Sequence, residues 1–254
     1  MGNKVSSLHS ASVSGDIERM RRCVEFGANP NDPRIAPLHA AALYGRVDIL
    51  TFLLDAGGNM HVLAPMTESL FPGSKILANP FPHGRFTPLG CAILANNAAC
   101  VELLLNRGAS PNTVAGENVP APLAIAIGSC ASSDILKQLV DAGAAVRHDE
   151  HTDYVFMAAM FGNIGALDVL RELGVTTDSV RLIDAVLDKA EANADIPVHE
   201  TMAWLLRHGD SGAALPTASL LTVPNLFHRL VRIGDRRLFD VVVDSLRTAF
   251  ALQE

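Results

Sequence analysis

A short pattern of small and apolar residues recurs along this chain about every 33 residues, and no other sequence feature limits its fold as strongly. Ser7-Leu8-His9 is followed thirty residues later by Pro37-Leu38-His39, and the pattern returns at Thr87-Pro88-Leu89. Further copies follow at Ala121-Pro122-Leu123, Ala158-Ala159, about 179–209 and Leu226-Phe227-His228. One unit of this length cannot bury its own apolar face, so the units are predicted to stack in a row.

Within each unit, the residue types favour two helices joined by a turn. Small residues such as Ala41 and Ala42 mark a first helix, because they let neighbouring helices approach closely. In the second helix, aliphatic side chains recur at helical spacing, as Ile49, Phe52 and Leu53 do. The chain is 49% hydrophobic but only 5% aromatic, a composition that suits closely stacked helices better than a β-sandwich.

The repeated residues resemble the ankyrin repeat, in which a T-P-L-H-x-A-A pattern is followed by a G-A-x-x-N close. Gly27-Ala28-Asn29-Pro30-Asn31 and Gly108-Ala109-Ser110-Pro111-Asn112 match that close. The resemblance implies an all-α ankyrin-repeat solenoid of about seven helix-turn-helix repeats with short inter-repeat hairpin loops, over residues 7–254. A closing helix is expected at about 235–253, with a polar outer side made by Arg236, Arg237, Asp240, Asp244 and Arg247.

Several histidines raise the question of an enzyme or a metal site. His9, His39 and His228 share one repeat position, where the resemblance implies hydrogen bonds to the backbone between adjacent units. His148-Asp149-Glu150-His151 is suggestive of a metal cluster, but it lies in a loop without further ligands, and zinc sites need three or four fixed ligands. We therefore expect no metal and no catalytic residue. A metal-dependent enzyme using His148, Asp149 and His151 is the alternative of a different class.

The N-terminus carries the sharpest chemical motif. Met1-Gly2-Asn3-Lys4-Val5-Ser6 fits M-G-x-x-x-[ST], so residues 1–6 are predicted to be an acylation segment in which Gly2 receives a myristoyl group. A single myristoyl chain binds a membrane only marginally. We expect a cytoplasmic protein held peripherally on the cytosolic face of a membrane. The alternative is a soluble regulator of the same binding class, with Gly2 unmodified.

Ankyrin-type stacks bind proteins through the hairpin tips and the groove lined by the first helices, as the resemblance implies. The two positions before each loop glycine are expected to face that groove. The candidate partner-binding residues there form an apolar strip of Leu43, Tyr44, Leu94, Met160 and Phe161. In the competing interpretation, about half of these side chains lie between the repeats.

An insertion at about 62–85 interrupts the repeats after the second unit. Four prolines exclude a long helix, yet the segment is too apolar for a plain solvated loop. Its candidate partner-binding residues are Met66, Leu70, Phe71 and Phe81. Three interpretations are open: a finger that binds a partner, a cover over the apolar strip, or simple packing against the edge of the solenoid.

These observations together predict a non-catalytic protein-binding module, which is a scaffold, an adaptor or an inhibitor. Its partners are one or more proteins, and a membrane through the acyl chain; no cofactor and no small-molecule substrate are expected. The net charge is −7, from 20 basic and 27 acidic residues, and the helices show no basic stripe with interleaved aromatics, so nucleic acid is not an expected partner. The four cysteines are expected to be buried thiols.

Overall fold

The computed structural model describes residues 2–32, 35–65, 67, 81, 83–112, 118–146, 153–175, 178–192, 198–209, 215 and 217–251, with the side chains of 2–6 and 249–251 excepted. The chain divides into two compact units, residues 1–147 and 148–254. The sequence pattern does not mark this division, and each unit is described by itself.

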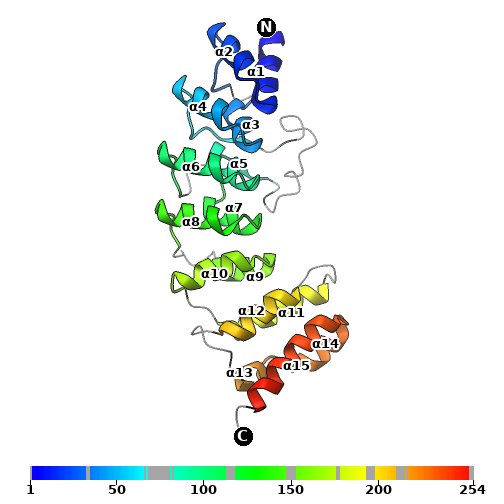
Figure 1. The fold of residues 1–254 in the computed structure, drawn as a ribbon. Helices are drawn as coiled ribbons and strands as arrows, with labels where there is room; N and C mark the ends of the chain where they lie inside the picture. The colour runs from blue at the N-terminus through cyan, green and yellow to red at the C-terminus, as the bar shows by residue number, and fades with distance from the viewer. Residues whose placement is uncertain are drawn as a thin grey trace. The chain divides into compact units, whose positions relative to one another are not determined.

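The first unit consists of four helix pairs, in which a first helix and a second helix run side by side (Figure 1). The pairs are α1 (Gly2–Ser14) and α2 (Ile17–Glu25), α3 (Pro37–Leu43) and α4 (Val47–Asp55), α5 (Pro88–Leu94) and α6 (Ala98–Asn106), and α7 (Pro122–Gly128) and α8 (Ser133–Asp141). The first helices α1, α3, α5 and α7 pack in one row, and the second helices α2, α4, α6 and α8 pack in the other. This is the stacking that the repeat predicts.

The second unit has the same scheme, with helices of more varied length. Its pairs are α9 (Tyr154–Phe161) and α10 (Ile164–Glu172), α11 (Ser179–Ala192) and α12 (Val198–His208), and α14 (Leu226–Ile233) and α15 (Arg236–Ala251), with the short α13 (Thr217–Leu221) before the last pair. The first helices α9, α11 and α14 pack in sequence, and α10, α12 and α15 do the same. Counted over the described residues, the chain thus holds seven helix pairs, and the all-α ankyrin solenoid is confirmed.

The core lies where the first helices stack. Every residue of α3, α5 and α7 is buried, and Ala40, Ala41 and Ala42 are fully inaccessible to solvent. Alanine has no side chain beyond Cβ, so helices meeting at these positions approach closely and leave no void. Within α7, Gly128 and Ala126 serve the same purpose, and Leu123, Ile125 and Ile127 supply the apolar bulk.

The turn between the two helices of a pair requires a left-handed residue. Gly45 adopts this left-handed conformation in the second pair, with φ +67°. Asn96 and Cys130 adopt it in the third and fourth pairs, with φ +56° and +53°. Asparagine tolerates this region better than most residues, but cysteine carries the steric cost of its Cβ. The expectation that all four cysteines are buried is wrong, because this turn places Cys130 at the surface; Cys91 and Cys100 are buried, and Cys23 is half-buried.

The insertion begins and ends in a short antiparallel ribbon. Strand β1 (Ala64–Pro65) pairs with strand β2 (Arg85–Phe86), with Ala64 opposite Phe86 and Pro65 opposite Arg85. Phe86 is 1% exposed and so fixes the ribbon to the core of the third repeat. The two ends of the insertion therefore leave the solenoid side by side.

The closing helix spans Arg236–Ala251, close to its predicted range. Its inner side buries Leu238, Val242 and Leu246. The residues expected on its polar outer side are exposed, and two ion pairs join them: Arg236–Asp240 at 3.7 Å and Arg247–Asp244 at 3.4 Å. At the other end of the chain, residues 2–6 form the first part of α1, and their assignment as a separate acylation segment stays a prediction. In the described part of the chain, no helix has the length and apolar character needed to span a membrane.

Candidate partner-binding surfaces

The predicted apolar strip does not form a continuous exposed surface in the first unit. Leu43 is 5% exposed and Leu94 is 9% exposed, so neither offers area to a partner, and their assignment to the groove is corrected. Each is the last residue of a first helix, α3 or α5, and those helices have neighbouring first helices on both sides. The next residue along, Tyr44, is half-buried and caps the C-terminus of α3.

In the second unit the predicted strip residues are more accessible. Phe161 ends α9 with 41% of its surface exposed, and Met160 beside it is half-buried. The ammonium group of Lys189 on α11 lies 5.4 Å from the centre of the Phe161 ring, a cation–π distance. Phe161 is therefore the strip residue that presents the largest exposed fraction, and an amphipathic lysine lies over its ring.

The candidate residues of the insertion are only partly described. Met66, Leu70 and Phe71 lie outside the described residues. Phe81 is half-buried, and its carbonyl oxygen accepts a hydrogen bond from Gly84 N at 2.9 Å. Gly84 has no room for a side chain, because a Cβ there would lie 2.7 Å from the Phe86 ring. The return of the insertion to β2 is thus closely packed.

His39 holds both ends of the insertion. Its Nε2 lies 3.0 Å from the Val62 carbonyl oxygen and 3.1 Å from that of Phe86. Carbonyl oxygens only accept hydrogen bonds, so Nε2 carries the proton and donates to both. The ring is 1% exposed, and burial lowers the pKa of His39 to about 4 despite these two hydrogen bonds. His39 is therefore a neutral structural residue, as the resemblance implies.

The other two histidines at this repeat position differ from each other. His9 Nδ1 lies 2.9 Å from the carbonyl oxygen of Ile35, just before the next first helix, which confirms the expected contact between units. His228 is exposed, and the expectation of a similar contact is wrong there, because no further first helix follows α14 in the described residues. The cluster His148-Asp149-Glu150-His151 lies outside the described residues. Among the residues that are described, no group of three His, Cys, Asp or Glu side chains is placed to hold a metal ion.

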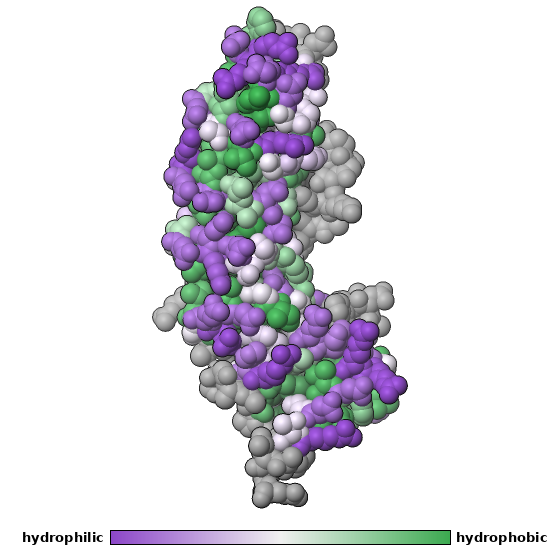
Figure 2. Space-filling view, viewed as in Figure 1, coloured by the Kyte–Doolittle hydropathy of each residue, from purple (hydrophilic) through white to green (hydrophobic). Residues whose placement is uncertain are grey.

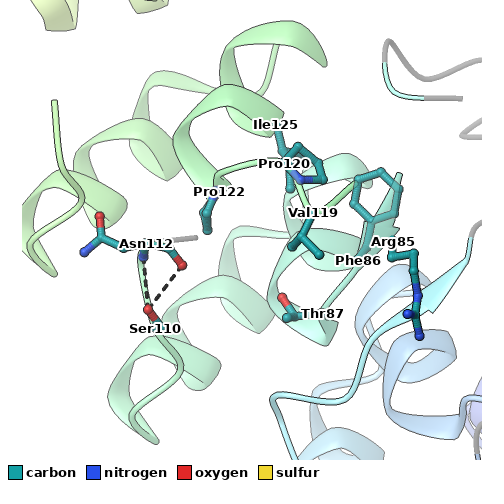
Figure 3. Close-up of a pocket in the computed structure, with 9 residues that line it drawn as sticks. All are labelled: Arg85, Phe86, Thr87, Ser110, Asn112, Val119, Pro120, Pro122 and Ile125. Carbon is teal, nitrogen blue, oxygen red and sulfur yellow. Dashed lines mark hydrogen bonds between the residues drawn. The ribbon is translucent and has the colours of Figure 1, made fainter. Parts of the chain in front are cut away.

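A pocket opens between the third and fourth repeats (Figure 3). It is lined by Arg85, Phe86, Thr87, Ser110, Asn112, Val119, Pro120, Pro122 and Ile125. Its polar side chains already have partners within the chain. Thr87 Oγ1 accepts from Gly90 N at 3.2 Å as the N-cap of α5, and the Ser110 hydroxyl donates to the Asn112 carbonyl oxygen at 3.2 Å. Arg85 Nη2 donates to the Leu63 carbonyl oxygen at 3.3 Å. This pocket is an inter-repeat crevice whose polar groups stabilise the fold.

Asparagine side chains join successive repeats, a role that sequence reasoning missed. Asn112 donates to the Gly143 carbonyl oxygen at 3.1 Å and accepts from Ala145 N at 2.8 Å. Asn31 makes the equivalent pair of hydrogen bonds with Gly57 and Asn59 in the next repeat. The signal was present as the last residue of each G-A-x-x-N close. His61 occupies this place in the second repeat, where the insertion begins.

A second set of hydrogen bonds fixes the turns between the two helices of a pair. Asn97 donates to the carbonyl oxygens of Ala42 and Leu43 at 2.9 and 2.8 Å, which belong to the preceding repeat. Arg46 donates in the same way to the Val13 carbonyl oxygen at 3.0 Å. The spacing between these turns in successive repeats is therefore set by side chains that cross from one repeat to the next.

An ion-pair cluster joins α11 and α14 in the second unit. Arg229 contacts the carboxylates of Asp184, Asp188 and Glu191, the last two at 2.6 Å. The hydrogen bond from Arg229 holds the pKa of Glu191 below its ordinary value, against the opposing effect of burial. The Arg229 side chain is 11% exposed, and its ion pairs hold the first helices α11 and α14 together.

The comparisons with known proteins agree with this geometry. Residues 8–54 match a model of ankyrin repeats in many copies, and residues 85–115 match a model of the single ankyrin repeat. The ankyrin repeat protein nuc-2 of Neurospora crassa is 30% identical over 151 residues, which cover 58% of this chain and 12% of that much longer protein.

Among solved structures, the human ASB11 ankyrin repeat domain is similar, with a TM-score of 0.55 and 20% sequence identity. The match covers 89% of this chain and 96% of that domain, and at this identity it bears on the fold alone. The seven stacked helix pairs in the described residues have the same fold as that domain. The chain thus folds as an all-α ankyrin-type solenoid, and its residues 8–54 and 85–115 match ankyrin-repeat models.

Proposed function

We propose that this chain is a non-catalytic scaffold, adaptor or inhibitor that presents its hairpin tips and first helices to a protein partner. Ankyrin repeats indicate a protein–protein interaction module, and no catalytic family is indicated. The observation that carries the proposal is the set of inter-repeat hydrogen bonds from Arg46 and Asn97, which joins the ends of neighbouring first helices and holds them in register. A pre-organised surface of this kind binds a partner with little ordering cost.

The ends of the first helices carry the side chains that we assign to binding. Tyr44 in the first unit and Phe161 in the second each combine an aromatic body with partial exposure. Aromatic side chains dominate binding energy at interfaces because they bury a large area and lose little conformational entropy. For Met66, Leu70, Phe71 and Phe81, the finger interpretation is supported by the ribbon and His39, which bring both ends of the insertion together on a rigid base.

The finer part of the proposal places the chain at the cytosolic face of a membrane through N-myristoylation of Gly2. Its support is the Met1-to-Ser6 motif. Because one acyl chain gives marginal membrane affinity, we propose that anchoring is reversible or is reinforced by a partner already at the membrane.

Intact mass spectrometry tests this assignment. The chain is expressed in a eukaryotic cell beside Gly2→Ala, with Asn3→Ala as the matched control that leaves the acceptor glycine in place. We expect one myristoyl group on the wild type and on Asn3→Ala, none on Gly2→Ala, and loss of membrane recovery only for Gly2→Ala. An unmodified wild type would instead support the second candidate, a soluble ankyrin regulator.

A further inference from the structure

The outer face of α2, which is turned away from α4, carries charged side chains where the next repeat has apolar ones. The guanidinium carbon of Arg21 on α2 lies 5.1 Å from the centre of the Phe52 ring on α4, so Phe52 faces the preceding repeat. The residues of α2 equivalent to Ile49 and Phe52 are Arg19 and Arg22, thirty positions earlier. Figure 2 shows mainly hydrophilic surface where Figure 1 places α1 and α2. This face therefore lacks the apolar character that stacking against another repeat requires.

The two arginines of this face make no ion pair within the described residues. Arg19 donates to the hydroxyl oxygens of Ser7 and Ser10 on α1, each at 3.4 Å. Arg22 donates to the Glu18 carbonyl oxygen, also at 3.4 Å. These hydrogen bonds are long and their acceptors are neutral, so the positive charge of both guanidinium groups remains available to an anion.

Phe26 adds an exposed aromatic ring to the same face. It follows Arg19 by seven residues and Arg22 by four, a spacing that places all three on one side of the helix. Phe26 is the C-cap of α2 and is 69% exposed. The C-caps of α6 and α10, Arg107 and Leu173, are exposed as well, so the exposure of Phe26 belongs to its place in the repeat. We call Arg19, Arg22 and Phe26 the basic face.

The acidic residues of α2 are turned away from the basic face. The Asp16 carboxylate accepts a hydrogen bond from Arg19 N at 2.9 Å and serves as the N-cap of the helix. Glu18 and Glu25 each come one residue before a member of the basic face, so they are rotated from it by about 100° around the helix axis. A flat anionic surface laid against the basic face therefore meets the arginines first and the two glutamates only at its border.

The basic face lies beside the predicted acylation site. Helices α1 and α2 are joined by residues 15–16 and pack against each other, so they run in opposite directions (Figure 1). The start of α1 at Gly2 and the end of α2 at Phe26 are therefore at the same end of the pair. This arrangement lets an acyl chain on Gly2 and the Phe26 ring enter one lipid surface together.

We propose that the basic face is the second membrane contact of this chain and that it binds an anionic lipid surface beside the acyl chain. The inference rests on the proposed myristoylation of Gly2. One myristoyl chain gives marginal anchoring, and a basic patch is a kind of second signal that makes it stable. Arg19 and Arg22 bind the lipid phosphate and carboxylate groups through charged hydrogen bonds, and Phe26 enters the boundary between headgroups and acyl chains.

Co-sedimentation with vesicles tests the proposal. The full chain is produced together with an N-myristoyltransferase, and intact mass verifies its acylation. The vesicles are phosphatidylcholine alone or phosphatidylcholine with about 30% phosphatidylserine, which supplies the negative surface charge. Each basic residue near such a surface strengthens binding roughly fivefold. Because the two glutamates at the border oppose part of this attraction, we expect the acylated chain to bind the anionic vesicles about tenfold more tightly.

Two variants separate the charge from the aromatic ring. Arg19→Gln/Arg22→Gln should lose the preference for anionic vesicles and bind neutral vesicles as the wild type does. Phe26→Ser should bind both kinds of vesicle at least about threefold more weakly, because it removes apolar area from the lipid contact. Circular dichroism verifies that each variant is folded, and Arg22→Gln alone serves if the double variant is not.

The matched controls make the same changes elsewhere. Arg236→Gln/Arg237→Gln removes two exposed positive charges from the second unit, and Leu173→Ser changes the equivalent C-cap of α10, which is 43% exposed. Both acylated controls are expected to bind vesicles as the wild type does. If the transferase leaves Gly2 unmodified, the proposed anchoring fails and this inference with it. An acylated chain that binds both vesicles equally, or a preference that survives in the folded arginine variant, overturns this inference alone and assigns the basic face to a protein partner.

Discussion

At the residue scale, His39 on the first helix α3 links the second repeat to both ends of the insertion. One ring nitrogen donates to Val62 and Phe86, which lie on either side of the insertion, while Nδ1 has no hydrogen-bond partner among the described residues. Ala36 stands where the repeat pattern has threonine, so no hydroxyl is available from that position. The buried ring is stable only in its neutral form, and this makes the second repeat sensitive to acid.

The acid sensitivity gives a first prediction. The pKa of His39 falls from 6.5 to about 4 on folding, so between these values the unfolded chain binds a proton that the folded chain does not. The free energy of unfolding is therefore unaffected by His39 above pH 6.5. It falls as the pH falls from 6.5 to 4, by about 3 kcal/mol in all. His39→Gln keeps an N–H donor and does not titrate, so its free energy of unfolding should fall less between pH 7 and about 4.5.

Urea unfolding at both pH values checks this difference. His61→Gln is the control, because His61 is exposed and lies three residues before the insertion ribbon. The pH dependence of its free energy of unfolding should match that of the wild type. Parallel pH dependence of the wild type and His39→Gln would contradict the assignment of the acid sensitivity to His39.

Burial separates two residues that the repeat pattern treats alike, and this gives a second prediction. Leu94→Ala should lower the free energy of unfolding by about 2–4 kcal/mol, because it leaves a cavity between α5 and its neighbours. Phe161→Ala removes a partly exposed ring and one cation–π contact, so we expect a loss below about 1 kcal/mol. Chemical denaturation of the two variants decides the matter, and equal losses would show that Phe161 belongs to the core.

At the element scale, the ribbon predicts that the insertion is separable from the solenoid. Pro65 and Arg85 already face each other, so an Asn-Gly turn can replace the nineteen residues 66–84 between them. Shortening the loop in this way should stabilise the fold by at most about 2 kcal/mol through closure entropy. Helical circular dichroism should be retained. A collapse of the helical signal would mean that the insertion supplies core residues.

The cluster around Arg229 gives a prediction for the packing of α14 on α11. Arg229→Met removes charged hydrogen bonds from a side chain that is 11% exposed, and we expect a loss of about 2 kcal/mol in the free energy of unfolding. Asp188→Asn is the matched control, because that carboxylate is 74% exposed and should contribute less than about 0.5 kcal/mol. Thermal unfolding of both variants measures the two losses in the free energy of unfolding. Equally small losses would show that solvent screens the whole cluster.

At the scale of the whole molecule, the division at residue 147 has a thermodynamic consequence. Trp204, the single tryptophan, lies in the second unit, where it is 7% exposed and donates to Asp168 at 2.8 Å. Its fluorescence therefore reports that unit, while circular dichroism reports both. In a solenoid each repeat is stabilised by its immediate neighbours, so a destabilising substitution in one unit lowers the stability mainly of the repeats near it.

We predict that Leu94→Ala, in the first unit, lowers the midpoint of the dichroism transition and leaves the midpoint of Trp204 fluorescence within experimental error. The two probes are followed in the same guanidinium titration. Equal shifts of both midpoints would show that the two units unfold as one cooperative body.

Much of the local structure follows from the sequence. The recurrence of Leu8, Leu38 and Leu89 predicts the helix pairs, and the resemblance to the ankyrin repeat implies the backbone contacts of His9 and His39. Leu43 and Leu94 could not be distinguished from Phe161 in this way, because all three lie near the end of a first helix in the repeat pattern. The myristoylation of Gly2 stays a prediction, since chemistry at a terminus depends on an enzyme that the fold does not contain.

The sequence by itself determined the repeating pairs of helices, because periodicity and turn residues act within a few positions of one another. The tertiary structure alone decided which side chains are available. Leu43 is covered because another first helix lies on each side of α3, while Phe227 and Val231 are exposed on α14, which contacts one other first helix, α11, in the part of the chain that the structure describes. The physical reason is that burial in a stack depends on the neighbouring repeat, whose position no short segment of the sequence encodes.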